Sequence, residues 1–487
     1  MPRFVSDGPD IPERLLWGHE EGKVVFFCGA GISYPAGLPD FKGLVEQIYY
    51  NLGTTRNLIE EKAFANFQYD ATLDLLERRI PGNRQAVRSA LDKVLKPKWR
   101  TKGATETHKA LLQLAEDRKG KVRLVTTNFD QIFERVRKQC SPPPPSFAAP
   151  LLPIPKPTRW HGVIYLHGLL PNIIDEISLN RLVLTSGDFG LAYLTERWAA
   201  RFVSELFRYY TVCLVGYSIN DPVLRYMMDA LAVDQMLGEV RPEAFAFGHY
   251  ENGDEARASA EWQAKGVIPL LYEIPSGTHD HSALHLTLKH WADTYRDGVS
   301  GKEMIVTQHA STPPLSSSRL DYAVGRTLWA LTDGLAAKHF ADLNPVPPLK
   351  WLEPLSQDQF KHEDLFRFGV TPNQEINEKL VFSFFRRPSP YTLAPHMCLV
   401  DIGLSASDWD EVMFHLSRWL VLHLNDPKLV LWLVKQGGQL DRRFARVVQK
   451  QLMHLDELAN DNNQRELDRI RASAPNADLP PISQTPP

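Results

Sequence analysis

The chain has 487 residues, of which 43% are hydrophobic and 23% are charged, and its formal net charge is −3. This length is enough for two or three domains, and the composition is that of an ordinary globular protein with an apolar core. The net charge excludes a general electrostatic attraction to nucleic acid or to an anionic membrane. We therefore expect no membrane partner and at most an indirect involvement of nucleic acid.

The four cysteines are far apart in the sequence, and no two of them have C-x-x-C spacing. This spacing excludes a cysteine-rich zinc ribbon, so we expect no metal site. The first residues carry charges and prolines instead of an apolar secretion segment, and no run approaches the ~20 apolar residues that cross a bilayer. The sequence therefore predicts a cytoplasmic protein.

Short apolar runs alternate with longer amphipathic segments through the first 290 residues. Six runs predict strands: Val24–Cys28, Val122–Thr126, Val163–Leu166, Val212–Val215, Ala244–Phe247 and Val267–Tyr272. Because both faces of these runs are apolar, they suit a parallel sheet that is covered by helices. The segments between them predict helices at Leu44–Asn51, Thr72–Glu77, Thr107–Glu116, Gln131–Gln139, Leu191–Tyr210 and Pro222–Leu237.

The alternation of strands and helices predicts an α/β domain with a doubly wound, mainly parallel, Rossmann-like sheet. We place this domain at residues 20–305, after an N-terminal extension at 1–19. The clearest helix is Leu191–Tyr210, where five large apolar side chains share one stripe. The proline-rich stretch Ser141–Pro157 cannot be a helix or a central strand and is expected to be a surface loop.

A polar segment rich in Ser, Thr and Pro at residues 306–318 predicts a linker between domains. Beyond it, residues 319–475 predict a mainly helical domain for sensing or oligomerisation. Its clearest helices are Trp409–Leu424, opened by Ser407 as an N-cap, Lys428–Gln436 and Arg442–Ala459. The proline-rich tail at 476–487 is expected to be disordered.

The first candidate site lies directly after the Val24–Cys28 run, where the sequence reads Gly29-Ala30-Gly31-Ile32-Ser33. Glycines at the end of a strand let backbone N–H groups approach a pyrophosphate, and the following helix adds its positive end. The spacing differs from the dehydrogenase G-x-G-x-x-G, because Tyr34 occupies the third glycine position. With the residues that follow, through Asp40 and Phe41, the segment reads GAGISYPAGLPDF.

Two further polar segments follow predicted strands. Thr126-Thr127-Asn128-Phe129-Asp130 comes after one strand, and Leu166-His167-Gly168 comes after the next. Each residue also has a structural interpretation: Asn128 or Asp130 as a helix N-cap, and His167 as a buried core imidazole. A fourth segment at the end of a strand, Val215 to Pro222, contains Gly216, Ser218 and Asp221. Here Ser218 or Asp221 is compatible with an N-cap and Pro222 with the first helical position, and a ligand role is compatible with both.

In their order and residue types, these segments resemble the motifs of the sirtuin (silent-information-regulator-type) superfamily. These motifs are its cofactor loop, its T-x-N-x-D motif, its catalytic H-G pair and its later G-T/Y-S loop. The resemblance covers about 270 residues and implies that NAD binds to this domain. It implies catalytic roles for Asn128, which would hold the ribose and orient water, and for His167, which would act as a base. An imidazole with a pKa near 6.5 fits that task.

The same resemblance implies the residues that would bind the cofactor. Asp40 and Asp130 would line the nicotinamide pocket, Phe41 would cover the reactive carbon, and Ser33 with the backbone of Gly29, Ala30 and Gly31 would hold phosphate. Gly216, Ser218 and Asp221 would lie on the adenosine side.

The chain also departs from the deacylating sirtuins. These carry a four-cysteine zinc ribbon after the H-G pair, whereas residues 169–188 of this chain contain no cysteine. Lys42 also replaces the arginine that usually follows the D-F pair. What remains resembles the NAD-consuming effectors of prokaryotic anti-phage systems, in which NAD depletion causes abortive infection.

The first hypothesis is therefore an NAD+ glycohydrolase that releases nicotinamide and ADP-ribose and is gated by assembly. We expect a homo-oligomer, or a partner such as a translocase ATPase or a phage trigger protein. The alternatives are an NAD-dependent protein deacylase or ADP-ribosyltransferase, and a non-catalytic module that senses nucleotides. His279, His281 and His285 leave metal binding conceivable, but a docked helix that closes the domain explains them more simply.

Overall fold

The structure, a computed structural model, describes residues 3–117, 119–171, 176–228, 242–296, 298–314, 322–356, 408–435 and 442–473. These residues fall into two compact units. The first lies within Met1–Met304 and Leu315–Trp329, and the second lies within Ile305–Pro314 and Ala330–Pro487. The predicted fold class, an α/β core followed by helical regions, is confirmed.

A seven-stranded parallel sheet forms the centre of the first unit. Its strands are β1 (Val24–Cys28), β2 (Arg123–Thr126), β3 (Ser146–Ala148), β4 (Gly162–Tyr165), β5 (Thr211–Val215), β6 (Ala244–Tyr250) and β7 (Ile268–Glu273). Their order across the sheet is β3-β4-β2-β1-β5-β6-β7, and every neighbouring pair is parallel. Six of these strands match the predicted ones to within a few residues, because apolar side chains fill both faces of a covered parallel sheet.

The strand that the sequence did not reveal is β3. It lies at the edge of the sheet, directly after the prolines at 142–145, and pairs only with β4. Its three side chains are half-buried, so it lacks the apolar run of the inner strands. The expectation that this stretch contains no central strand agrees with its place at the edge.

The order of the strands creates a topological switch point between β1 and β5. From β1 the chain continues to β2 on one side, and β5 then returns to pair with the other side of β1. In open α/β sheets, ligands bind in the crevice beyond the carboxyl ends of the strands at this point. Residues 29–41 and 216–221 follow β1 and β5 and therefore border this crevice.

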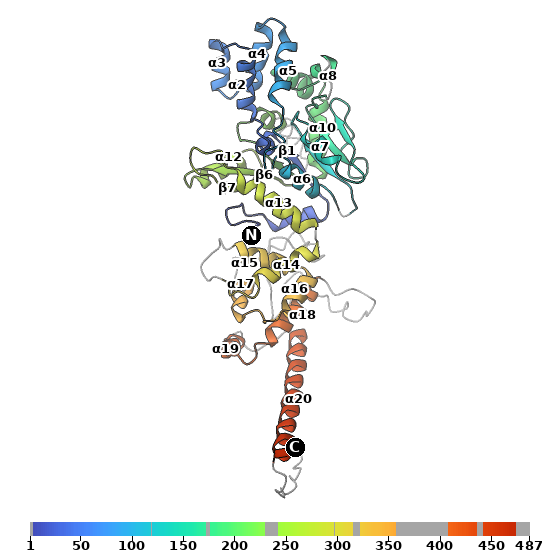
Figure 1. Cartoon of the computed structure of the whole chain (residues 1–487), viewed down its shortest axis with the longest axis vertical. Coiled ribbons are helices and arrows are strands. Elements are labelled where there is room, and N and C mark those ends of the chain that lie inside the picture. The colour runs from blue at the N-terminus through green and yellow to red at the C-terminus, as the bar shows by residue number, and fades with distance from the viewer. Residues whose placement is uncertain are drawn as a thin grey trace. The chain divides into compact units, whose positions relative to one another are not determined.

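Helices surround the sheet in the first unit (Figure 1). In chain order they are α1 (Glu13–Glu20), η1 (Ala30–Ala36), α2 (Phe41–Asn51), α3 (Leu58–Ala65), α4 (Tyr69–Arg79), α5 (Asn83–Val94), α6 (Glu106–Leu114), α7 (Ile132–Arg137), α8 (Glu176–Asn180), α9 (Ser186–Phe189), η2 (Gly190–Thr195), α10 (Trp198–Tyr209), α12 (Glu255–Gln263) and α13 (Ser282–Arg296). Between β1 and β2, helices α2 to α5 pack on one another and, together with α8, lie beyond the sheet at the top of Figure 1. We call α2–α5 the helical insert.

The predicted single helix Leu191–Tyr210 is wrong. The segment is divided into the π-helical turn η2 and the helix α10, separated by Arg197, which adopts a left-handed φ of 59°. Leu191 and Leu194, expected on the buried stripe, are 49% and 69% exposed, and Tyr193 is buried instead. The apolar periodicity belongs to α10 alone. The buried face of this helix packs into the core against side chains of the sheet. Of the predicted helix Pro222–Leu237, residues 222–228 are helical and the rest lies outside the described residues.

The described elements of the second unit are helical. The unit includes the end of α14 (Val299–His309) and the last residue of α15 (Tyr322–Ala330). Its complete elements are α16 (Gly334–Asp342), η3 (Leu349–Trp351), α17 (Leu352–Ser356), α18 (Asp408–Val421), α19 (Pro427–Lys435) and α20 (Arg442–Ser473). The predicted helices near 409–424 and 428–436 correspond to α18 and α19, whereas α20 extends 14 residues beyond the predicted end at Ala459. Ser407 and the tail at 476–487 lie outside the described residues.

The predicted linker at 306–318 begins inside a helix. Residues 306–309 belong to α14, and Ala310 directly follows its end. Val306 and Ala310 are four residues apart, and both are fully buried. Four-residue spacing places both side chains on one face of a helix, a pattern that the polar residues between them conceal in the sequence.

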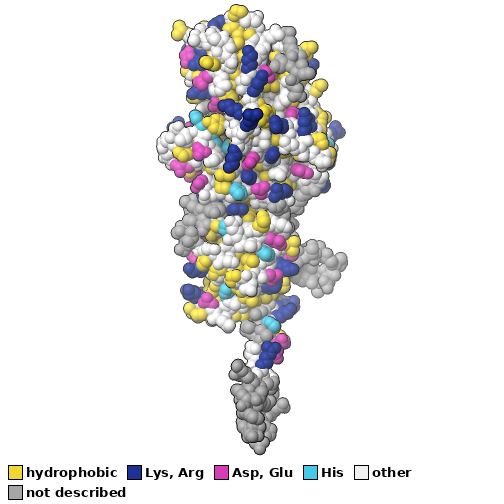
Figure 2. All heavy atoms as spheres, viewed as in Figure 1, with side chains coloured by type: hydrophobic (Ala, Val, Ile, Leu, Met, Phe, Trp, Pro, Cys, Tyr) yellow, Lys and Arg dark blue, Asp and Glu magenta, His cyan; other side chains and the backbone are white. Residues whose placement is uncertain are grey.

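Charged side chains of both signs are interspersed over the face of the molecule drawn in Figure 2, which fits the small net charge. Within the described residues, no helix combines the length and the apolar character needed to span a bilayer.

Candidate active site

Two glycine turns meet at the switch point. Gly31 N–H donates to the carbonyl oxygen of Gly216 at 2.9 Å, and Gly29 N–H donates to that of Val215 at 2.8 Å. Gly216 has a φ of +77°, and a Cβ there would lie 2.8 Å from the Ile32 nitrogen. The glycines therefore allow the turns after β1 and β5 to interlock. The sequence suggested that the amides of Gly29 and Gly31 point to a ligand. In the structure, both amides donate to the neighbouring turn instead.

Beyond these turns lies a partly open pocket, the inner compartment. It brings together most of the residues singled out in the sequence: Ala30, Ser33, Asp40, Phe41, Asn128, Asp130, His167 and Asp221. These side chains come from four loops at the carboxyl ends of strands β1, β2, β4 and β5. The remaining wall is mostly apolar, with Leu38, Leu44, Leu95, Val183 and Phe189 among its residues.

A second pocket, the outer compartment, adjoins the first. It is bordered by Gly31, Gly216 and Ser218 and by aromatic and histidine side chains near the ends of β6 and β7, including Phe247, His249, Tyr272 and His281. The two compartments share Ala30, Asp40, Phe41 and Asp221 in their walls. They therefore adjoin one another and form one cleft in two parts.

Four buried polar side chains form a network at the base of the inner compartment. Ser33 Oγ donates to Asp130 Oδ2 at 2.8 Å and accepts from Asn128 Nδ2 at 3.1 Å, and His108 Nε2 lies 3.3 Å from the same hydroxyl. All four residues are less than 9% exposed. Ser33, expected to hold phosphate, is thus engaged by three side chains inside the protein.

This network fixes the amide of Asn128. Because its nitrogen donates to Ser33, its oxygen is directed away from Ser33 and can serve as an acceptor. Asp130 accepts a backbone bond from Ile132 N at 2.9 Å, but the N-cap of α7 is Gln131, so Asp130 lies one residue before the N-cap position that the sequence suggested. Burial raises the pKa of Asp130, and bonds from Ile132, Ser33 and Asn128 oppose that rise.

His167 is 1% exposed and lines the inner compartment. Its Nε2 lies 3.0 Å from Tyr193 Oη, and its ring packs edge-on against Phe189 at a centroid distance of 5.1 Å. Burial lowers the pKa of His167 to about 3, with a small opposing effect from Asp188. The expectation of an imidazole with a pKa near 6.5 is therefore wrong, because desolvation disfavours the charged ring. His167 is neutral at physiological pH.

Two carboxylates stand where the compartments join. Asp40 caps α2, accepting from Gly43 N at 2.7 Å, and its side chain is exposed. Asp221 accepts from Val223 N at 2.9 Å, with Pro222 at the first helical position, as the structural interpretation predicts. Burial raises the pKa of Asp221 to about 7, and the nearby negative charges of Asp40 and Asp70 add to this rise.

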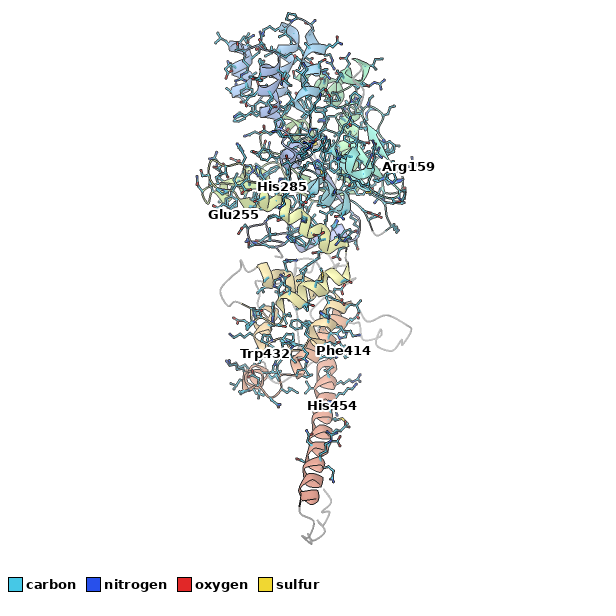
Figure 3. All side chains as sticks on the ribbon, in the orientation of Figure 1. Arg159, Glu255, His285, Phe414, Trp432 and His454 are labelled. Carbon is cyan, nitrogen blue, oxygen red and sulfur yellow. The ribbon has the colours of Figure 1, made fainter. Side chains whose placement is uncertain are left out.

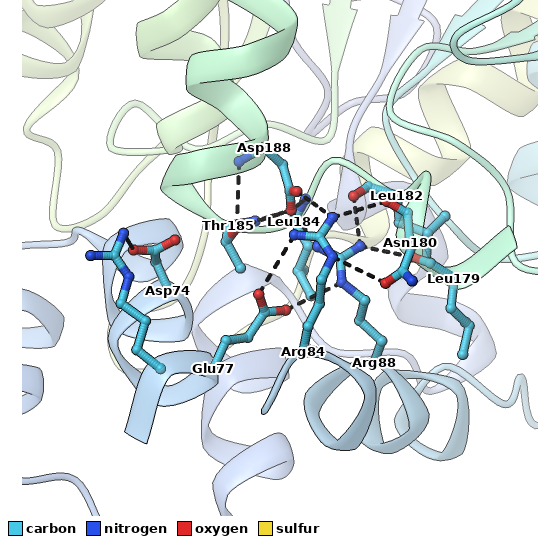
Figure 4. Close-up of polar contacts among 11 residues, drawn as sticks. Asp74, Glu77, Arg84, Arg88, Leu179, Asn180, Leu182, Leu184, Thr185 and Asp188 are labelled. Atoms are coloured by element: carbon cyan, nitrogen blue, oxygen red, sulfur yellow. Dashed lines mark hydrogen bonds and ion pairs between the residues drawn. The ribbon is translucent and has the colours of Figure 1, made fainter. Parts of the chain in front are cut away.

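A buried ionic cluster holds the wall beside His167 (Figure 4). Arg88, on α5, is fully buried; it pairs with Asp188 and Glu77 and donates to the carbonyl oxygens of Leu179 and Leu182 at 2.8 and 2.7 Å. Arg84 adds a second pair to Asp188. The cluster therefore ties the helical insert to residues 179–189.

The segment that Arg88 holds contacts the H-G pair directly. Val183 N–H donates to the carbonyl oxygen of His167 at 2.9 Å. Gly168 has a φ of +97°, and a Cβ there would lie 2.8 Å from a methyl of Leu182. Glycine is needed at 168 for both reasons, and the wall residues Val183 and Phe189 are positioned through these contacts.

Sequence reasoning missed several residues of the site. Tyr193 lay within the predicted helix Leu191–Tyr210 but off its apolar stripe, and Arg88 and Asp188 are more than 90 residues apart, with no motif to link them. Tyr217, which bonds to Thr127 Oγ1 at 2.7 Å beneath the compartments, lies inside the fourth segment but was not selected. A buried arginine and its acceptors can be recognised only after the fold has brought them together.

Of the histidines near residue 280, His279 and His281 border the outer compartment. His281 Nδ1 lies 2.9 Å from Tyr272 Oη, and His285, on α13 (Figure 3), lies 2.9 Å from Thr107 Oγ1. Over the described ranges, no three His, Cys, Asp or Glu side chains are grouped as metal ligands would be. The contacts of His281 and His285 are those of a docked helix.

Comparison with known proteins identifies the domain. The family model of the SIR2-like domain matches residues 122–270. The uncharacterized protein y4cA of Sinorhizobium fredii (strain NBRC 101917 / NGR234) is 36% identical over 331 residues, which are 66% of this chain and 27% of that protein. The NAD-dependent protein deacetylase hst4 of Emericella nidulans is 30% identical over 154 residues, 32% of this chain and 23% of the relative. The chain thus spans about a quarter of the length of each of these relatives.

The chain contains a SIR2-like domain, and SIR2-like domains use NAD. The matched range includes Asn128, Asp130, His167, Gly216 and the other selected residues of the later segments, whereas the glycine loop at 29–41 precedes it. That loop borders the same cleft in the structure. The predicted kinship is confirmed at the level of the domain and of an NAD-related function.

Proposed function

We propose that this domain is an NAD+ glycohydrolase, which cleaves NAD+ with water to nicotinamide and ADP-ribose. The observation that carries the proposal is the presence of Asn128 and His167 in one compartment that shares part of its wall with a second one. A dinucleotide fits such a two-part cleft better than a small metabolite does. The individual roles below are part of the proposal.

The nicotinamide riboside would occupy the inner compartment and the adenosine the outer one. The inner compartment has buried hydrogen-bonding groups for a ribose and a carboxamide, with Phe41 and Phe189 in its wall. The outer compartment offers Phe247, Tyr272 and histidine rings, against which an adenine can stack. The pyrophosphate would then cross the shared wall near Ala30 and Asp221.

In the reaction, the bond between C1′ of the ribose and the nicotinamide nitrogen breaks, and its electron pair leaves with the nicotinamide. Positive charge develops on the ribose, so a neutral His167 avoids the repulsion that an imidazolium would cause. The Asn128 oxygen would accept a hydrogen bond from the incoming water or from a ribose hydroxyl. The water oxygen bonds to C1′, and its proton passes to an acceptor and then to solvent.

Deacylation of a protein is the main enzymatic alternative, because the relative in Emericella nidulans is named a protein deacetylase. Two features favour hydrolysis. Residues 169–188 have no cysteine to build a zinc ribbon, and the buried Arg88 cluster holds the end of this segment. ADP-ribosyl transfer and non-catalytic nucleotide sensing remain as further alternatives, and the intact Asn128 and His167 argue against the sensing module.

We also propose that the enzyme is the NAD-depleting effector of an anti-phage system. An unregulated NAD+ hydrolase would be toxic to its own cell, so its activity needs a gate. Assembly through the helical second unit, with more copies of the chain or with a partner such as an ATPase or a phage protein, is the gate that we favour. Light scattering alongside turnover per chain tests it: turnover that is independent of assembly state would contradict this gate.

The function itself is tested by substituting Asn128→Ala. Loss of a group that orients the nucleophile is expected to lower turnover by about 100-fold or more, while circular dichroism and melting stay near the wild type. Asn51→Ala is the matched control, because Asn51 is exposed at the end of α2 and its side chain donates to the Gln47 carbonyl oxygen on the same helix. Turnover of Asn128→Ala equal to that of the control would remove Asn128 from the mechanism.

A further inference from the structure

We propose that Tyr193 is the positioning residue of His167: its hydroxyl selects the tautomer and the ring orientation in which the imidazole acts. The inference rests on the proposed function for its kinetic consequence. The contact itself is a property of the fold and can be tested without turnover.

The polar contact is direct and enclosed. Tyr193 Oη lies 3.0 Å from His167 Nε2, and the two residues are 3% and 1% exposed. Among the described residues, no second side chain is seen to hydrogen-bond to the His167 ring. The apolar edges that surround the ring, Phe189 and the Tyr193 ring itself, restrict its plane but do not distinguish its two nitrogens. The hydroxyl is therefore the group that can make this distinction.

Both side chains, Tyr193 and His167, are neutral at physiological pH. Burial, and then the nearby Asp221, raise the pKa of Tyr193 above its ordinary value, so the phenol stays neutral. Burial keeps His167 neutral as well. A neutral imidazole has one N–H and one acceptor nitrogen, and the bond made by one nitrogen decides which of them carries the proton. A phenol hydroxyl can donate or accept but donates more readily, so its bond favours the tautomer in which Nε2 accepts and Nδ1 carries the proton.

Tyr193 is itself held by a stack of aromatic rings. Phe189 and Tyr226 lie parallel at 4.7 Å with an angle of 3°, and Tyr193 packs on both at 6.1 and 5.8 Å. The hydroxyl of Tyr226 donates to the buried Asp70 on α4 at 3.0 Å. A continuous set of contacts therefore runs from the helical insert through Tyr226 and Tyr193 to His167.

The irregular backbone at this point places the tyrosine. A single regular helix through 191–210 would direct Leu191 and Leu194 to the core, as the sequence suggested. Instead the π-helical turn η2 and the left-handed Arg197 expose both leucines and bury Tyr193 beside the histidine. π-Helical turns frequently occur at functional sites, and the exposed leucines show what the turn costs in apolar burial.

The test is Tyr193→Phe in the full chain, which removes one oxygen atom and keeps the aromatic stack. We expect kcat for NAD+ cleavage to fall by about 10- to 100-fold, the range for a misdirected acid–base group. The Kd of NAD+ from calorimetry should change by less than about threefold, because the hydroxyl acts through His167. Tyr210→Phe is the matched control: Tyr210 is equally buried and bonds to Trp160 Nε1 at 3.2 Å, away from the compartments.

A second measurement separates this inference from the proposed function. Imidazole ¹⁵N shifts of histidine-labelled protein report the tautomer of His167, assigned by the signal that His167→Ala removes. The wild type and Tyr210→Phe should show one fixed neutral tautomer from pH 5 to 8, and Tyr193→Phe should show a mixture or the other tautomer. A wild type without NAD+ cleavage would refute the proposed function, yet the shifts would still decide the role of Tyr193. Unchanged shifts in Tyr193→Phe would overturn the inference, as would unchanged kcat.

Discussion

The buried arginine of α5 gives the sharpest prediction about the architecture of the site. Arg88→Met keeps a long side chain of similar bulk, so it removes charge and hydrogen bonds with little new cavity. The change removes the arginine donor from the Leu179 and Leu182 carbonyl oxygens, of which Leu179 keeps the Leu182 N–H at 3.3 Å. It also takes Arg88 from Glu77 and one of two arginines from Asp188. We expect residues 179–189 to lose their attachment to the helical insert.

The magnitude follows from the remaining partners. Removing one member of a buried ion pair costs about 3–5 kcal/mol. Asp188 keeps Arg84, the backbone amides of Leu184 and Thr185 and the Thr185 hydroxyl, so we take the lower end, about 3 kcal/mol. For a segment that opens locally, this corresponds to a roughly 100-fold faster amide exchange.

Hydrogen–deuterium exchange of the full chain measures this effect on peptides that cover 179–189, with peptides of β5 and β6 as internal references. Arg84→Met is the matched control; its side chain is 37% exposed, so we expect a loss of at most about 1 kcal/mol. Protection of 179–189 in Arg88→Met equal to that in the wild type would refute the reasoning.

The cluster also has a defined dependence on pH. Burial alone would raise the pKa of Asp188, but Arg88, Arg84 and the backbone amides hold it below its usual value. A carboxylate with a depressed pKa stabilises the fold fully above its unfolded pKa, near 4, and that stabilisation is lost as the pH falls through the folded pKa. The contribution of Asp188 to the protection of 179–189 should therefore be constant above about pH 5 and decline below about pH 4. Burial raises the pKa of Glu77 in the same cluster, so its ionisation has an effect of the opposite sign at higher pH.

Two further predictions concern the junction of the compartments. Gly216→Ala should weaken NAD+ binding and destabilise the domain by about 1–3 kcal/mol, because the new Cβ would lie 2.8 Å from Ile32 N at positive φ. Gly266→Ala is the control for calorimetry, because Gly266 has a similar φ of +71° but open space around it. An equal loss of stability in both variants would show that the contact with Ile32 does not matter. Asp221, with a pKa of about 7, should repel the pyrophosphate once it ionises, so the Kd of NAD+ should rise between pH 6 and 8.5 and stay flat in Asp221→Asn; a wild-type Kd that does not change with pH would contradict this.

The sequence was sufficient for the sheet and for the polar ends of its strands. Inner strands such as β1 and β5 are apolar on both faces, and the glycine, Asn128 and His167 segments directly follow them, so local patterns carry the information. The edge strand β3 and the division of Leu191–Tyr210 escaped prediction because both depend on tertiary contacts. A short half-buried strand has no apolar run, and apolar leucines in η2 imitate a helical stripe.

The chemistry of individual side chains was less predictable than their location. The sequence places His167 at a strand end, but only the enclosed ring shows why its pKa is low. Likewise, Ser33 lies in the predicted cofactor loop, but only the fold reveals that its hydroxyl is hydrogen-bonded to Asn128 and Asp130. Burial and long-range partners decide both properties, and neither is encoded in the spacing of a motif.

The most direct test of the central claim is to follow NAD+ in H₂¹⁸O with the full chain, in the presence and absence of an acetyl-lysine peptide. Hydrolysis predicts equal release of nicotinamide and ADP-ribose, with one ¹⁸O on the C1′ carbon of the ADP-ribose, independent of the peptide. Cleavage that requires the peptide and yields an acylated ADP-ribose would contradict the account and identify a deacylase. Unlabelled ADP-ribose attached to protein would identify a transferase instead.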